Sequence, residues 1–149
     1  EFSSGDLWTL HVYAEGRDIA ARLAYVTADP GASVTDEYGG QKRAGALPEA
    51  AVRGLPILLT ECGGIGFGRY GDSDFSYGDI PQTAAALERQ ICDVTEMIKA
   101  AHTLQGFVWT QLTDIQQEIN GLLYFDRTPK LPLPTLRAII ASVGRNKGE

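Results

Sequence analysis

The sequence predicts an α/β fold built on a parallel sheet. Three short apolar runs have the composition of buried strands, and helical patterns lie between and after them. Parallel strands need crossover connections, which helices usually supply. The loops after the strands are long and rich in glycine and aromatic residues, notably residues 62–80 and 111–120. Functional residues of α/β proteins gather at the carboxyl ends of strands, so we expect a site there.

The three predicted strands are residues 7–13, 55–60 and 106–110. The first is rich in aromatic and β-branched residues, which favour strands. The second is almost entirely apolar, as a strand buried on both faces of a sheet would be. The third opens with a glycine and continues with apolar and aromatic residues.

Four segments have helical patterns: residues 17–26, 49–53, 82–104 and 133–143. In the third, apolar residues recur at alternating spacings of four and three, which places them on one face of a helix. Helices and strands follow one another without an internal repeat or a linker. The chain of 149 residues is therefore expected to be one domain, with a long loop before the second strand.

The charge balance excludes several classes of partner. Thirteen Lys and Arg residues against 19 Asp and Glu residues give a net charge of −6, and no basic run stands out. This argues against nucleic acid or an anionic membrane as the main partner. No apolar run approaches the ~20 residues of a membrane span, and the polar N-terminal segment does not resemble a signal peptide. The localisation stays open, with the cytoplasm favoured.

The sequence predicts neither a metal site nor a cofactor. Cys62 and Cys92 are too few for a disulfide scaffold or a four-ligand zinc site, although one bridge between them remains possible. The glycines of residues 64–68 follow a strand, but Arg69 stands where a dinucleotide fingerprint needs its third glycine. A P-loop motif and the GxSxG motif of serine hydrolases are also absent from the sequence.

Glu61 is the first candidate for a functional residue. It directly follows an apolar strand, where a carboxylate is costly unless polar partners hold it. The two glycines after Cys62 let the backbone turn away and a ligand approach closely. The alternative is a strand-end glutamate that caps a neighbour or points to water.

His11, Tyr13 and Trp109 are further candidates at strand ends. His11 and Tyr13 lie two residues apart on one strand and should face the same side. They could form a site pair, while the alternative for His11 is a core histidine. Trp109 could fill the core or form a platform for a sugar, and its position alone favours the core. His102, near the end of a predicted helix, is interpreted as a helix-terminal or surface residue.

Three stretches resemble glycoside hydrolase family 2. LPILLTECGG at residues 55–64 is similar to the nucleophile strand of that family, where an apolar run ends in Ser/Thr-Glu, an aromatic or Cys, and two glycines. GFVWTQLTDIQQEINGLLYFDRTPK at residues 106–130 is similar to the last barrel strand and closing segment. Residues 7–13 resemble the strand that precedes the nucleophile strand. The three matches occur in the family's order and cover nearly the whole chain.

The resemblance implies that residues 1–149 are part of a (β/α)8 (TIM) barrel catalytic domain, its C-terminal portion with strands six to eight. It implies a retaining, β-galactosidase-like glycosidase that hydrolyses O-glycosidic bonds through a glycosyl-enzyme intermediate on Glu61. Tyr13 would hydrogen-bond this nucleophile. Trp109 would line the sugar subsite. His11, from its position two residues before Tyr13 on the same strand, is predicted to bind substrate with Tyr13 and Trp109.

The sequence departs from the family's pattern in two respects. The family's acid/base glutamate follows an asparagine, and this chain has no Asn-Glu dipeptide. A whole barrel also needs at least ~200 residues. We therefore expect the chain alone to be inactive, either as a piece of a larger enzyme or as the product of a truncated reading frame. In addition, Asn120-Gly121-Leu122 lacks the lysine of the family's glucuronidases, which disfavours a glucuronide substrate.

The expected partners follow from the incomplete barrel. An unpaired edge on residues 7–13 should bind the remainder of the barrel or a second copy of the chain, in addition to a β-linked carbohydrate substrate. The alternative function is a non-catalytic carbohydrate-binding or assembly module. Four aromatic residues after Glu61 could stack on sugar or fill a partner's groove, although packing of their own loop is favoured. They are Phe67, Tyr70, Phe75 and Tyr77.

Overall fold

The computed structural model describes residues 6–13, 35–38, 41–44, 54–68, 71, 74–77, 79–102 and 104–144. The helices predicted at residues 17–26 and 49–53 lie outside these ranges, as does Tyr70.

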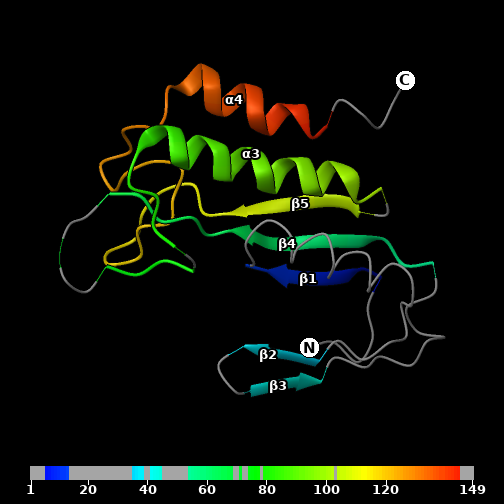
Figure 1. The fold of residues 1–149 in the computed structure, drawn as a ribbon. Helices are drawn as coiled ribbons and strands as arrows, with labels where there is room; N and C mark the ends of the chain where they lie inside the picture. Colours follow the sequence, from blue (N-terminus) through cyan, green and yellow to red (C-terminus); the bar gives the residue numbers. More distant parts are fainter. Residues whose placement is uncertain are drawn as a thin grey trace.

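The core of the structure is a three-stranded parallel sheet with two helices on one face (Figure 1). The strands are β1 (Trp8–Val12), β4 (Ile57–Gly63) and β5 (Leu104–Thr110), in the spatial order β1-β4-β5. The helices are α3 (Ala84–Ala100) and α4 (Leu133–Ser142). The three carboxyl ends point the same way, and the loops after β4 and β5 gather beyond them. The predicted α/β class and the order of the strands are confirmed.

A second sheet is a short antiparallel pair, β2 (Thr35–Tyr38) and β3 (Gln41–Ala44). The sequence analysis placed these residues in a long loop, and that prediction was wrong. The strands TDEY and QKRA are short and mostly polar, so they lack the apolar alternation that identifies a strand. The two glycines between them in the sequence are the hairpin signal that could have revealed the pair.

Helix α3 begins where its sequence supplies a cap. The Thr83 side chain accepts a hydrogen bond from the Ala86 backbone N–H at 3.1 Å, which satisfies one of the free donors of the first turn. The helix ends at Ala100, whereas the apolar spacing predicted that it would continue to Leu104. Leu104 is buried as the first residue of β5 instead. Its side chain thus fits the helical spacing while belonging to the sheet.

Apolar side chains from the sheet and both helices form two packed clusters. The first joins the helix-facing side of the sheet to α3: Val12, Ile57, Leu59, Cys62, Val94, Ile98, Leu104 and Val143. The second fixes the first half of α3 against α4 and the segment before it: Leu87, Ile91, Leu131 and Leu136. Burial of these side chains stabilises the fold by roughly 1.5–3 kcal/mol for each large aliphatic residue.

A β-bulge at Thr60 sets the direction of Glu61. Leu10 pairs with Leu59, but the next residue of β1, His11, pairs with Glu61, so Thr60 is an extra residue. The pairing with β5 shifts in the same stretch, between Leu59 and Cys62. Leu59 and Cys62 are both fully buried in the helix-facing core although they lie three residues apart. The extra residue therefore leaves Glu61 on the opposite side from the helices.

Candidate functional site

Two side chains contact the carboxylate of Glu61: His11, which lies in β1, and Tyr13, which directly follows β1. The Tyr13 hydroxyl donates a hydrogen bond to Oε2 of Glu61 at 2.6 Å. Nδ1 of His11 lies 3.2 Å from the same oxygen. The side chains of His11 and Glu61 are 49% and 40% exposed, so the pair is open to solvent. The interpretation of His11 as a core histidine is therefore wrong, and the predicted grouping of His11, Tyr13 and Glu61 is present.

The environment of Tyr13 keeps its hydroxyl protonated. Burial is the largest cause that raises the pKa of Tyr13, and the hydrogen bond to Glu61 and the nearby Glu61 charge add to it. A hydrogen bond with the Thr110 side chain acts in the opposite direction and lowers the pKa of Tyr13 without reversing the shift. Tyr13 thus remains a hydrogen-bond donor to the carboxylate at neutral and mildly alkaline pH.

Gly63 and Gly64 make room for aromatic rings at the end of β4. A Cβ on Gly63 would lie 2.4 Å from the Trp109 ring, and one on Gly64 would lie 2.8 Å from both Tyr13 and Tyr77. Both glycines also have positive φ, at +85° and +65°. Side chains other than hydrogen would therefore clash and strain the backbone here. These glycines leave space for aromatic rings, and the approach of a ligand beside them stays a prediction.

Trp109 is placed by packing at the carboxyl end of β5. Its ring contacts both apolar clusters and lies against Gly63. Its Nε1 atom is buried and has no hydrogen-bond partner among the residues that the structure describes. No contact with Glu61 is recorded for it, so the role of Trp109 at a sugar subsite stays a prediction.

The two cysteines are free thiols. Cys62 is fully buried, its Sγ lies 3.3 Å from the Val108 carbonyl oxygen, and burial raises its pKa to about 12. A neutral, inaccessible thiol is a poor nucleophile. The possible Cys62–Cys92 bridge is therefore not formed, and Cys62 fills the core beside Glu61.

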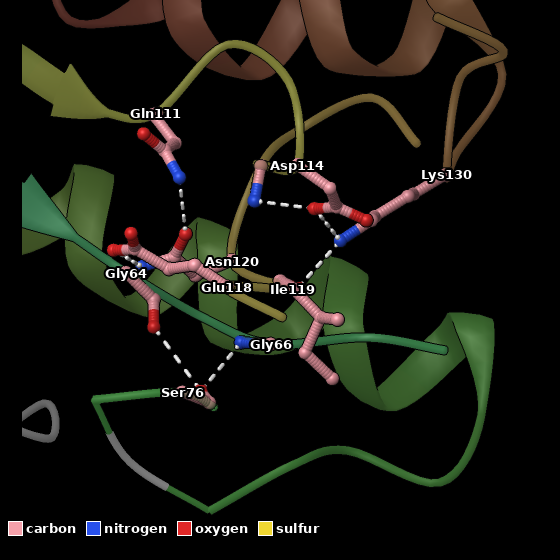
Figure 2. A network of polar contacts seen from close by, with 10 residues as sticks. Gly64, Gly66, Ser76, Gln111, Asp114, Glu118, Ile119, Asn120 and Lys130 are labelled. Carbon is pink, nitrogen blue, oxygen red and sulfur yellow. Dashed lines mark hydrogen bonds and ion pairs between the residues drawn. The ribbon is translucent and has the colours of Figure 1, made fainter. Parts of the chain in front are cut away.

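A buried ion pair fixes the loop after β5 (Figure 2). Nζ of Lys130 lies 2.7 Å from Oδ1 of Asp114 and donates to the Ile119 carbonyl at 2.6 Å. Asp114 Oδ1 also accepts from the Gly121 N–H at 2.8 Å. Both side chains are almost fully buried, at 1% and 0% exposed. Both residues lie in the stretch 106–130 that resembles the family, but sequence reasoning did not pair them, because they are 16 residues apart.

A second set of polar contacts lies on the same loop. Nε2 of Gln111 donates to Oδ1 of Asn120 at 2.9 Å, and Nδ2 of Asn120 donates to Oε1 of Glu118 at 3.1 Å. Asn120 is 1% exposed and therefore holds the loop from within. These contacts and the ion pair order the closing segment that the sequence analysis recognised only by resemblance.

Within the described residues, no three histidine, cysteine or acidic side chains come together in a way that could hold a metal ion. The described helices include none that is both long and apolar enough to cross a membrane. His102 is exposed just after α3, as its surface interpretation predicted.

The comparisons with known proteins concern the fold. No protein-family model matches the sequence, and no curated protein matches it. The chain is similar in structure to a GH2 β-galacturonidase from Eisenbergiella tayi solved with glycerol. The TM-score is 0.56 and the identity 13%, over 92% of this chain and 24% of that one. A β-glucuronidase from Bifidobacterium dentium solved with coumarin-3-O-glucuronide gives a TM-score of 0.43 and 20% identity, over 58% of this chain and 15% of the other.

The first likeness indicates that the chain has the fold of part of a GH2 glycosidase. The chain spans about a quarter of the length of the galacturonidase. The fold agrees with the family resemblance of the sequence motifs, because the three parallel strands occur in the order that the resemblance implies.

Proposed function

We propose that the chain is the nucleophile-bearing portion of a retaining β-glycosidase, comprising strands six to eight of a (β/α)8 barrel. The observation that carries the proposal is the contact of Tyr13 with Glu61 at the carboxyl ends of two neighbouring parallel strands. The motif around Glu61 and the likeness to a GH2 enzyme support it independently. The proposed substrate is a neutral β-galactoside, because the lysine of the family's glucuronidases is missing after Asn120.

In the proposed reaction, Glu61 attacks the anomeric carbon of the sugar. A carbon–oxygen bond forms to the carboxylate while the glycosidic bond breaks, and the leaving oxygen takes a proton from a second carboxylic acid. Water then displaces the carboxylate with retention of configuration. Tyr13 and His11 both contact Oε2, so Oε1 is the oxygen we assign to attack.

The second carboxyl group must come from outside strands six to eight. Retaining enzymes hold the two carboxyl groups about 5–5.5 Å apart. In the three-stranded sheet, β1 and β5 are the edge strands. Edges of this kind bind further strands, and we propose the remaining barrel strands as their partner, with a second copy of the chain as the alternative.

Complementation tests the proposal. We expect the chain to show no enzyme-like turnover of a β-galactoside by itself. Mixing it with a chain that supplies strands one to five and the acid/base glutamate of a GH2 β-galactosidase should restore hydrolysis, and Glu61→Gln should abolish it. Protonation of the leaving group typically contributes about 10²–10⁴-fold, which sets the size of the gain. Nitrophenyl β-galactoside, β-glucuronide and β-galacturonide should be hydrolysed in that order of preference.

Two results would contradict this function. One is turnover of an alkyl galactoside by the isolated chain that Glu61→Gln destroys, since this would require no second glutamate. The other is a mixture whose chains co-elute on size exclusion yet hydrolyse nothing. Sugar binding by the isolated chain that survives Glu61→Gln but weakens with Trp109→Ala would then identify a carbohydrate-binding module.

Replacing Tyr13 with phenylalanine is expected to slow the complemented enzyme about 10- to 100-fold in kcat. This is the rate equivalent of the ~1.5–3 kcal/mol that a hydrogen bond to a charged group contributes. The ring and its packing remain, so thermal stability should change little. Phe125→Leu, on an exposed loop residue, is the matched control and should leave kcat unchanged. An unaltered kcat in Tyr13→Phe would remove Tyr13 from the mechanism.

A further inference from the structure

Tyr77 stacks on Tyr13, whose hydroxyl contacts the Glu61 carboxylate. The ring centroids of Tyr13 and Tyr77 are 3.9 Å apart, and their planes differ by 9°. Phe75 packs edge-on against Tyr77, with centroids 5.1 Å apart and planes at 75°. A continuous series of contacts thus leads from Phe75 through Tyr77 and Tyr13 to Oε2 of Glu61.

The backbone around Tyr77 is fixed to the loop that follows Glu61. The Tyr77 N–H donates to the Gly64 carbonyl at 3.3 Å. Ser76 Oγ accepts from the Gly66 N–H at 2.8 Å and donates to the Gly64 carbonyl at 3.3 Å, as Figure 2 shows. Tyr77 therefore has a defined position relative to β4 and does not depend on the stack for its own placement.

The same segment is also fixed from its other side. The Phe75 N–H donates to the Gln117 carbonyl at 2.6 Å, and the Ile119 N–H donates to the Phe75 carbonyl at 3.0 Å. Residues 75–77, which belong to the loop after β4, are thus hydrogen-bonded to the loop after β5. The buried Asp114–Lys130 pair orders the second of these loops, because Lys130 donates to the Ile119 carbonyl.

Gly64 lies against the rings of both Tyr13 and Tyr77. A Cβ there would lie 2.8 Å from Cδ1 of Tyr13 and 2.8 Å from Cδ2 of Tyr77. The Tyr13 ring is thus confined by Gly64 and by the parallel face of Tyr77. A tyrosine has two freely rotating side-chain bonds, and this packing restricts both of them.

We propose that Tyr77 is a positioning residue of the Glu61 site, which holds the Tyr13 hydroxyl on Oε2 of Glu61 by stacking on the Tyr13 ring. The catalytic meaning of this contact rests on the proposed function, whereas the contact itself does not. Glu61, the Thr110 side chain and Tyr77 are the groups that act on the Tyr13 hydroxyl. Of these three, Tyr77 is the one whose ring stacks on the face of the Tyr13 ring.

The test is the exchange of the Tyr13 hydroxyl proton with water in the isolated folded chain at neutral pH, followed by NMR of tyrosine labelled with carbon-13 at Cζ in a mixture of light and heavy water. Tyr13→Phe identifies the Tyr13 signal among the six tyrosines. In Tyr77→Ala we expect this exchange to become about 10-fold faster, because the Tyr13 ring loses its stacking partner and the hydrogen bond to Glu61 loosens. Tyr77→Phe keeps the stacked ring and should exchange like the wild type. Phe125→Ala, which removes an exposed ring elsewhere in these loops, should also have no effect.

Thermal melting separates positioning from general stability. If Tyr77 only stabilised the loop, Tyr77→Ala would lower the melting temperature and leave the exchange rate of the Tyr13 hydroxyl unchanged, and this result would overturn the proposal. Should Tyr77→Ala fail to fold, Tyr77→Leu keeps the apolar bulk without the flat ring and must still speed the exchange. In the complemented enzyme, Tyr77→Ala should reduce kcat about 10-fold with little change in KM. Faster exchange in Tyr77→Ala without any complementation would keep Tyr77 as a positioning residue and reject the glycosidase.

Discussion

Replacing Lys130 with methionine is expected to lower the free energy of unfolding by about 3–5 kcal/mol. The substitution keeps most of the apolar stem but removes the ammonium group from Oδ1 of Asp114 and from the Ile119 carbonyl. The Asp114 side chain is 0% exposed, so its carboxylate would lose its charged partner while still accepting from the Gly121 N–H. An uncompensated buried charge of this kind is among the most destabilising changes a protein can undergo. Urea unfolding followed by circular dichroism measures the effect.

The control variants separate the buried charge from the lost contact. In Asp114→Asn combined with Lys130→Met, the buried carboxylate becomes a neutral amide that can still accept from Gly121. The double variant should therefore be more stable than Lys130→Met alone. Lys99→Met removes the ammonium of an ion pair whose Glu96 side chain is 66% exposed, and it should cost at most about 1 kcal/mol. Equal losses in Lys130→Met and the double variant would exclude the stranded carboxylate as the cause.

The Asp114–Lys130 ion pair orders the loop after β5 more than it adds to the stability of the fold. Burial lowers the pKa of Lys130, and the adjacent Asp114 carboxylate opposes this shift without cancelling it. The ammonium form is thus less favourable at this position than in the unfolded chain. The pair is better understood as fixing one arrangement of the closing loop than as a net source of stability. That loop carries Ile119, which is hydrogen-bonded to Phe75 and so to the segment that presents Tyr77.

The sequence was most informative where a local pattern and burial agree. The apolar run that becomes β4 and the four-three spacing of α3 were both recognised, because each element buries one continuous apolar surface. Glu61 stood out for the opposite reason, as a charge placed at the end of an apolar strand. Its partners His11 and Tyr13 could be proposed from the strand period of two, together with the family resemblance.

Features that depend on distant pairing could not be predicted in this way. The bulge at Thr60 leaves no trace in composition, because it is defined only by the pairing with β1 and β5. The Asp114–Lys130 pair joins residues 16 apart in the loop after β5, and the stack joins Tyr77 to Tyr13 at the end of β1. Of the aromatic residues after Glu61, Phe67 and Tyr77 pack as expected, whereas Phe75 stays about half exposed and Tyr70 lies outside the described residues. Which ring meets which residue is decided by the hydrogen bonds of Ser76 and Tyr77 to the glycines.

Replacing Gly63 with alanine is expected to lower the free energy of unfolding by about 2–5 kcal/mol. An L-residue at a φ of +85° costs roughly 1–2 kcal/mol. The added Cβ would also lie 2.4 Å from the Trp109 ring, and overpacking of a core typically costs about 1–3 kcal/mol more. The ring cannot move freely, since it is packed against both apolar clusters and lies beside the core around Cys62.

Two other glycines of the chain separate these contributions. Gly54 has a φ of +78° with nothing within 4 Å of an added Cβ, so Gly54→Ala measures the backbone cost alone. Gly71 has neither a positive φ nor a close neighbour, and Gly71→Ala should be almost neutral. Chemical unfolding of the three variants should give the order Gly63→Ala, Gly54→Ala, Gly71→Ala, from the largest loss to the smallest. In a Trp8→Phe background, only Gly63→Ala should change the fluorescence of Trp109, because only there does the new methyl group meet the indole. Equal losses for Gly63→Ala and Gly54→Ala would mean that the Trp109 ring moves aside at no cost, and that Gly63 does not fix its position at the carboxyl end of β5.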